Sequence, residues 1–93
     1  MEISYDAEKR QRTLCERGLD FDDAVHVFAG PEFSVEDDRR DYGEMWFQTF
    51  GPLHGRLVTL VWTARSEARH VISMRKCNER EQERYEKQLR RSR

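Results

Sequence analysis

The run of residues that most constrains the fold is Leu57 to Trp62, where every position except Thr59 is apolar. A short run that is apolar without alternation is typical of a strand buried on both faces. Short turn segments separate it from Glu44–Phe50 before it and from Arg69–Met74 after it, and both of these also have strand-like patterns. Because short connections join antiparallel neighbours, we expect an antiparallel sheet with Leu57–Trp62 in its centre.

The N-terminal segment predicts a short strand followed by a charged helix. Glu2–Tyr5 alternates like a strand, and Asp6 is placed to cap a helix over Ala7–Arg17. Gly18 can adopt the left-handed conformation that ends such a helix. Three side chains of this helix are expected to face inward: Ala7, Leu14 and Cys15.

A second helix is predicted directly after the first, with Asp20 as its cap. Its apolar residues fall at the i, i+3, i+4 and i+7 positions that form one helix face: Phe21, Ala24, Val25 and Phe28. Gly30–Pro31 ends it, since proline cannot continue a helix. The segment therefore predicts an amphipathic helix lying on the sheet.

The remaining segments complete an α+β domain. Phe33 and Val35 alternate with polar residues as in a strand, whereas Glu36–Asp41 reads as a charged loop. Asn78 and Glu81 have the spacing of a capping box that opens a C-terminal helix, with Tyr85 and Leu89 as its thin apolar stripe. We expect one domain over residues 1–93: an antiparallel sheet of about four strands, two N-terminal helices packed on it, and a C-terminal helix.

Composition excludes several classes of protein. No apolar run approaches the roughly 20 residues that span a bilayer, and the N-terminus lacks the apolar segment of a signal peptide. Cys15 and Cys77 are too few for a disulfide framework, and the His and Cys residues lack zinc-site spacing. A cytoplasmic protein without a cofactor or a metal is expected.

The charge is unevenly distributed along the chain. The formal net charge is -1, but residues 65–93 carry ten Lys or Arg against five Glu, whereas residues 1–64 carry seven against thirteen acidic residues. Around the predicted strands near the C-terminus, the cations are Arg65, Arg69, Arg75 and Lys76. Guanidinium groups offer paired donors that match a phosphate. This half of the chain therefore predicts an anionic polymer or a phosphoester as its partner.

Several short segments, in order and spacing, resemble the BrnT family of bacterial type II toxins, relatives of the RelE ribonuclease toxins. The resemblance covers roughly residues 3–89. The matching segments are Tyr5–Asp6 with Lys9, Gly18–Phe28, Tyr42–Glu44, Val61–Arg65, Ile72–Lys76 and Glu83–Tyr85. The chain differs where the family has an arginine soon after Gly-Glu, because Met45 and Trp46 follow Glu44 here. It also has Arg17 where the family often has a histidine before Gly18.

The resemblance implies a RelE-like fold and a small ribonuclease that arrests growth by cutting RNA. It further implies a cognate antitoxin similar to BrnA, which blocks the toxin in a hetero-oligomer. In that family the antitoxin carries the DNA-binding region, so DNA would be contacted only through the antitoxin.

Metal-independent RNA cleavage needs a base for the 2′-hydroxyl, charge stabilisation at the phosphate and an acid for the leaving oxygen. The candidates for the phosphate clamp are Arg65, Arg75 and Lys76, and those for proton transfer are Glu67, His70 and Tyr85. The candidates for further RNA contacts are Arg69, Arg80, Arg84 and Trp46. Each has a structural alternative: an arginine can be an exposed turn residue, and Tyr85 can be a packing residue of the last helix.

A different class of function also fits the sequence. A non-catalytic domain of the same fold could bind a partner chain, through the acidic first part or the thinly apolar last helix. The Met45–Trp46 departure from the family pattern favours this alternative. Cleavage of RNA by the purified protein separates the two hypotheses.

Overall fold

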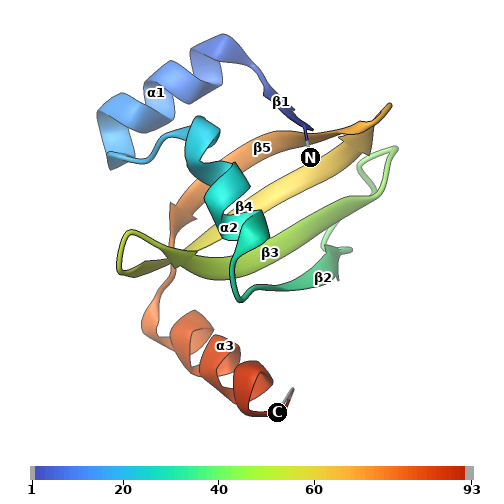
Figure 1. Cartoon of the computed structure of the whole chain (residues 1–93). Helices are drawn as coiled ribbons and strands as arrows, with labels where there is room; N and C mark the ends of the chain where they lie inside the picture. The colour runs from blue at the N-terminus through green and yellow to red at the C-terminus, as the bar shows by residue number, and fades with distance from the viewer. Residues whose placement is uncertain (1, 92–93) are drawn as a thin grey trace.

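The computed structural model describes residues 2–91 and contains a five-stranded mixed sheet with helices on both of its faces (Figure 1). The elements in chain order are β1 (Glu2–Tyr5), α1 (Ala7–Arg17), η1 (Phe21–Asp23), α2 (Ala24–Ala29), β2 (Phe33–Asp37), β3 (Trp46–Leu53), β4 (Arg56–Arg65), β5 (Ala68–Lys76) and α3 (Glu79–Arg91). The strand order is β1-β5-β4-β3-β2, so the apolar run lies in the central strand, as predicted. The α+β class is confirmed.

Strand β1 adds a feature that the sequence patterns did not predict. It pairs in parallel with β5, whereas the β2–β3, β3–β4 and β4–β5 pairs are antiparallel. Parallel neighbours need a long connection, and here the chain between β1 and β5 includes all the other strands. The first and last strands of the chain therefore lie side by side.

The first face of the sheet, which carries α1, η1 and α2, holds the main core. Its buried residues are Leu19, Phe21, Ala24, Val27, Phe28, Leu53, Val58, Leu60, Val71 and Met74. Helix α2 lies so close to β3 that a Cβ added at Gly51 would come within 3.0 Å of a methyl carbon of Val27. The glycine therefore permits the close approach of helix and strand.

The predicted inward face of α1 is wrong, since the helix contains no buried residue. Ala7, Leu14 and Cys15 are all exposed. Polar contacts of Lys9, Arg10 and Arg17 hold the helix against the rest of the protein. Asp6 caps it, as predicted, by accepting from the backbone N–H groups of Glu8 and Lys9. Short charged helices with a weak apolar face depend on such contacts with the rest of the protein.

The predicted second helix begins with a 3₁₀ turn, Phe21–Asp23, before the α-helix Ala24–Ala29. This change of helix type shifts the apolar face. Val27 is fully buried, and Val25 is only half-buried. A 3₁₀ turn has fewer residues per turn than an α-helix, so an α-helical spacing counted from Phe21 points to the wrong valine.

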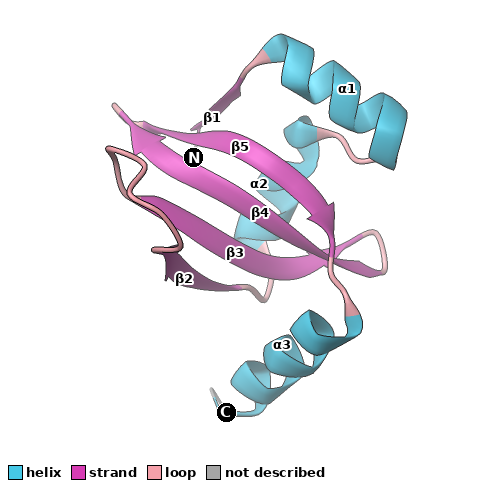
Figure 2. Cartoon of the chain, turned by 180° about the vertical axis from the view of Figure 1, so that it is seen from behind, coloured by secondary structure: helices cyan, strands magenta, loops and turns pink. Residues whose placement is uncertain are grey.

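The second face of the sheet is covered at one end by α3. Tyr85 and Leu89 pack there against Phe33 and Phe50. The predicted capping box is present, with Asn78 Oδ1 accepting from the Glu81 N–H and Glu81 Oε1 accepting from the Asn78 N–H, both at 2.9 Å. Figure 2 views the sheet from this side and shows β4 and β5 without a helix in front of them.

Two predicted boundaries differ from the structure. Strand β2 continues through Asp37, which is buried, so this part of the predicted charged loop is wrong. Strand β3 extends to Leu53, and only His54 and Gly55 form the turn.

Among the described residues, no helix is both long and apolar enough to cross a membrane.

Candidate functional site on the second face of the sheet

A band of polar and aromatic side chains crosses the part of the second face that α3 leaves open. We name it the polar band, and its residues are Arg39, Tyr42, Glu44, Trp46, Arg65, His70, Arg75 and Glu81. Side chains that pair directly across strands share a face. Trp46 is paired with Thr63 and Thr63 with His70, while Thr59 is paired with Arg75.

A bulge in β5 places His70 and Arg75 on the same face. These residues are five positions apart, and strict alternation would put them on opposite faces. The pairing shifts between Val61 and Trp62 of β4, which oppose Ser73 and Val71 and leave Ile72 as an extra residue. The extra residue resets the alternation. The bulge is therefore what brings the two predicted site residues together.

One end of the polar band is an ion pair beside a histidine. Arg65 Nη2 lies 3.3 Å from Glu44 Oε1, which also accepts a 3.1 Å hydrogen bond from Trp46 Nε1. These two donors hold the pKa of the Glu44 carboxyl below its usual range, although burial acts the other way. Glu44 thus links Trp46 on β3 to Arg65 at the end of β4.

His70 is half-buried next to this pair. Burial lowers its pKa below the usual 6.5, and the charge of Arg65 lowers it further, although Glu44 opposes this effect. Its Nδ1 lies 2.9 Å from the hydroxyl oxygen of Ser4 on the neighbouring strand β1. The imidazole is therefore neutral at physiological pH and is oriented by a hydrogen bond, two properties of a general base.

Arg75 occupies the other end of the polar band. Its Nη1 and Nη2 donate to the two oxygens of Glu81 at 2.7 and 2.6 Å. This bidentate pair lowers the pKa of Glu81 and raises that of Arg75. Since Glu81 also closes the capping box, the start of α3 fixes the position of the Arg75 guanidinium.

The middle of the polar band is built on Asp37, whose side chain is fully buried. Both carboxylate oxygens accept from Arg39, at 2.7 Å each, and this contact lowers the pKa of Asp37. The charge of Arg39 also reaches this pair: it adds to the lowering of the Glu81 pKa and offsets a small part of the rise in the Arg75 pKa. Arg39 is therefore close enough to the Arg75–Glu81 ion pair to interact with it electrostatically.

Tyr42 and Trp46 form an aromatic platform beside Arg39. Their ring centroids are 3.8 Å apart and the rings are parallel within 5°. The two rings line an open cavity of about 510 Å³ together with Arg39 and Arg40. Flat aromatic surfaces next to guanidinium groups can bind a base and a phosphate at once.

Four of the residues singled out in the sequence lie on the polar band: Trp46, Arg65, His70 and Arg75. The others lie elsewhere. Arg69 is on the first face, over the rings of Phe28 and Trp62. Glu67 is exposed in the turn after β4, and Lys76 is exposed at the end of β5.

The candidates on α3 also lie away from the polar band. Tyr85 is buried, its ring stacks on Phe33, and its hydroxyl donates to the carbonyl of Pro31. The guanidinium of Arg84 lies over the rings of Phe33 and Phe50, while Arg80 is exposed. These contacts give Tyr85 and Arg84 a packing role.

Sequence reasoning missed Asp37, Arg39, Tyr42 and Glu81. One signal was available, because the alternation of Phe33 and Val35 continues to position 37 and puts an acid on an apolar face. A buried carboxylate requires a partner, and Arg39 follows two residues later.

Within residues 2–91, no group of three or more His, Cys, Asp or Glu side chains is arranged to hold a metal ion.

Comparison with known proteins adds a family to this geometry. A model of the family described as "Ribonuclease toxin, BrnT, of type II toxin-antitoxin system" matches residues 5–81. The matched range includes every residue of the polar band. A search of curated proteins finds no match to the chain. Because the family model covers most of the 93 residues, the chain belongs to the BrnT family of type II toxin–antitoxin ribonuclease toxins.

Proposed function

We propose that this protein cleaves RNA on the second face of its sheet, without a metal ion, and that a cognate antitoxin neutralises it. The observation that carries the proposal is the composition of the polar band. It combines three guanidinium groups, a neutral histidine and an aromatic platform on one open face. Each part meets one requirement of RNA cleavage: phosphate stabilisation, proton transfer and base binding.

His70 is the proposed general base. If Nδ1 donates its proton to the Ser4 oxygen at 2.9 Å, Nε2 keeps the lone pair that accepts the proton of the 2′-hydroxyl. The 2′-oxygen then attacks phosphorus and the bond to the 5′-oxygen breaks. The products are a 2′,3′-cyclic phosphate and a 5′-hydroxyl, whose proton comes from water.

Arg65, next to His70, is proposed to stabilise the charge that develops on the scissile phosphate. Arg39, in the middle of the band, and Arg75, at its other end, bind neighbouring phosphates of the same strand. Their carboxylate partners, Asp37 and Glu81, hold the guanidinium groups in fixed orientations. Fixed donors need no reorganisation when the charge forms, which is the main advantage of a preorganised site.

The platform of Tyr42 and Trp46 is proposed to stack on a base of the substrate. Stacking on an aromatic ring favours single-stranded RNA, because a paired base does not expose its face. Arg40 lines the same cavity and can reach an adjacent phosphate. The proposed substrate is therefore a single-stranded or looped region of RNA.

The same open face is the proposed docking site of the antitoxin. Met45, beside the platform, is a large apolar residue with 57% of its surface exposed. An antitoxin segment that carries acidic residues and an apolar anchor would fit this combination. By covering the polar band it would block the substrate.

The purified protein tests the proposal. We expect it to cleave a single-stranded RNA in excess EDTA, and to leave a 2′,3′-cyclic phosphate. An RNA that is 2′-O-methylated throughout should remain intact, because its 2′-oxygen cannot be deprotonated. Cleavage that stops in EDTA would contradict the metal-independent mechanism. Absence of cleavage by protein that binds the antitoxin would favour the non-catalytic interaction domain.

A further inference from the structure

A second group of cations lies around a cavity at the other edge of the molecule. The cavity has a volume of about 300 Å³ and is lined by side chains of the α1–η1 connection and of the β3–β4 turn with the end of β5. Three of its lining residues are cationic: Arg17, Arg56 and Lys76. None of them belongs to the polar band.

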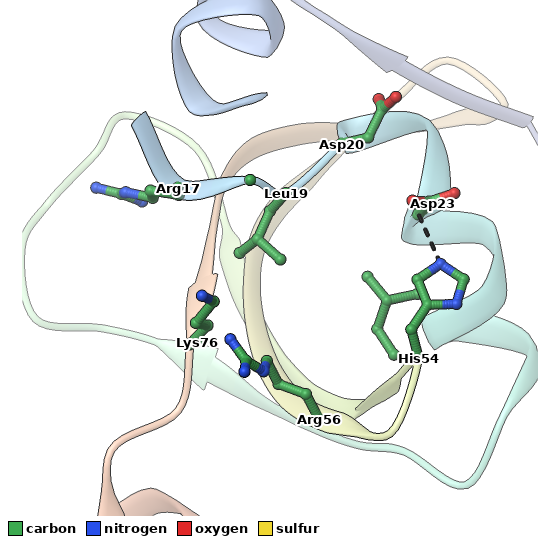
Figure 3. A pocket seen from close by; sticks show the side chains of 9 residues that line it. Arg17, Leu19, Asp20, Asp23, His54, Arg56 and Lys76 are labelled. Carbon is green, nitrogen blue, oxygen red and sulfur yellow. Dashed lines mark ion pairs between the residues drawn. The ribbon is translucent and has the colours of Figure 1, made fainter. Parts of the chain in front are cut away.

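The acidic residues of this cavity are already paired. Asp20 accepts from Arg10 at 2.8 and 3.0 Å, and Asp23 lies 3.6 Å from His54. Figure 3 shows Asp23 turned toward His54, whereas Arg56 and Lys76 extend toward one another on the other side of the cavity. The positive charge on that side is therefore not neutralised by these carboxylates.

The guanidinium of Arg17 has a fixed position at the rim. Its Nη1 donates to the carbonyl of Met74 at 2.9 Å, and Gly18 ends α1 in the left-handed conformation with φ of 68°. Among the described residues, Arg56 and Lys76 take part in no ion pair that the structure records. One oriented guanidinium and two unpaired cations form a site suited to a phosphate.

This cavity connects to the second face of the sheet. A neighbouring cavity of about 490 Å³ shares Arg56 and Lys76 with it and extends to Leu57, Cys77 and Gln82. Leu57 and Cys77 pack with the residues that α3 covers on the second face. Lys76 follows Arg75 directly, and adjacent strand residues point to opposite faces. The end of β5 thus carries a cation toward each face.

We infer that the cavity of Arg17, Arg56 and Lys76 is a second phosphate-binding site for RNA, which holds the strand after it leaves the polar band and passes around the start of β4 and the end of β5. This inference rests on the proposed function. Contacts from these cations to phosphate oxygens carry no sequence information. The site lengthens the footprint of the enzyme on RNA and adds affinity that is independent of sequence.

Binding of a fully 2′-O-methylated single-stranded RNA tests the inference, since this RNA cannot be cleaved. The variant R56Q/K76Q removes two cations. The matched control K87Q/R90Q removes two exposed cations of α3. We expect R56Q/K76Q to bind several-fold more weakly at low salt, with a plot of log affinity against log salt that is less steep by about 0.7 for each lost contact. Two RNA sequences should lose the same factor.

The possible negative results distinguish a failure of this inference from a failure of the proposed function. Equal affinity and equal salt dependence of R56Q/K76Q and the control overturn the inference, while cleavage of unmodified RNA by the wild type leaves the proposed function in place. A wild type that neither binds nor cleaves RNA overturns both. If R56Q/K76Q loses affinity only for the antitoxin, the cavity binds acidic side chains of that partner, and the RNA assignment is wrong.

Discussion

The buried carboxylate of Asp37 carries a testable stability effect. It accepts two charge-assisted hydrogen bonds from Arg39, so replacing it with asparagine should reduce the unfolding free energy at pH 7 by about 2 kcal/mol. The folded pKa of Asp37 lies below its unfolded value. The stabilisation is therefore present above the unfolded pKa of about 3.9 and is lost as the pH falls through the folded pKa.

Urea denaturation at several pH values measures this effect. The difference between wild type and D37N should be constant from pH 8 to pH 5 and should shrink below pH 4. D38N is the matched control, because Asp38 is exposed. A difference between wild type and D37N that grows on acidification would contradict the assigned pKa direction.

His70 offers a test of the electrostatics of the polar band that does not depend on activity. Burial and Arg65 both lower its pKa, so an NMR titration of the wild type should give a midpoint below 6.5. Removing the cation with R65Q should move the midpoint upward, because the remaining charge of Glu44 raises the pKa of His70. A midpoint that is unchanged in R65Q would show that Arg65 does not act on the histidine.

Single residues of the site could be predicted where their chemistry is unusual for their place in the sequence. Arg65, His70 and Arg75 stand out around apolar strands, and the structure places them on one face. Arg69 and Tyr85 have side chains that could serve the same chemistry, but their surroundings give them packing contacts instead. Those surroundings depend on tertiary packing, which one sequence does not reveal.

Among the elements, the strands and the capping box follow directly from sequence patterns, but the bulge at Ile72 does not. Without it His70 and Arg75 would point to opposite faces. The bulged residue has no distinctive sequence signal, since Ile is a residue type that is enriched in regular strands. The helix types at Phe21–Ala29 were missed for a similar reason, because the apolar spacing is compatible with more than one helical geometry.

The start of α3 is expected to be the element whose stability depends most on one side chain. Glu81 accepts from both the Asn78 N–H and Arg75. Replacing it with glutamine weakens both contacts, and we expect the unfolding free energy to fall by about 1 to 2 kcal/mol. Hydrogen exchange should become faster in α3 and should change less in β4. E83Q, an exposed position on the same helix, is the control; equal effects of the two variants would contradict the account.

For the whole molecule, the net charge of -1 does not describe the charge of any one surface, because many of the charged side chains are paired with each other. The acidic residues Asp20, Asp37 and Glu81 each accept hydrogen bonds from an arginine. The overall charge therefore says little about the binding face. The uneven charge along the sequence was the better guide, although the fold distributes the basic residues over two faces of the sheet.

The central claim is that the polar band is the site of RNA cleavage, and induced expression in bacteria tests it most directly. Wild type, R65A and the control R12A, at an exposed position of α1, are induced without antitoxin, and growth and total RNA are followed. We expect wild type and R12A to arrest growth and degrade RNA, and R65A to lose roughly 100-fold in cleavage rate after purification. R65A should still fold, as judged by circular dichroism, and R65Q serves as a second variant. Growth arrest by folded R65A and R65Q equal to that of the wild type would contradict the account.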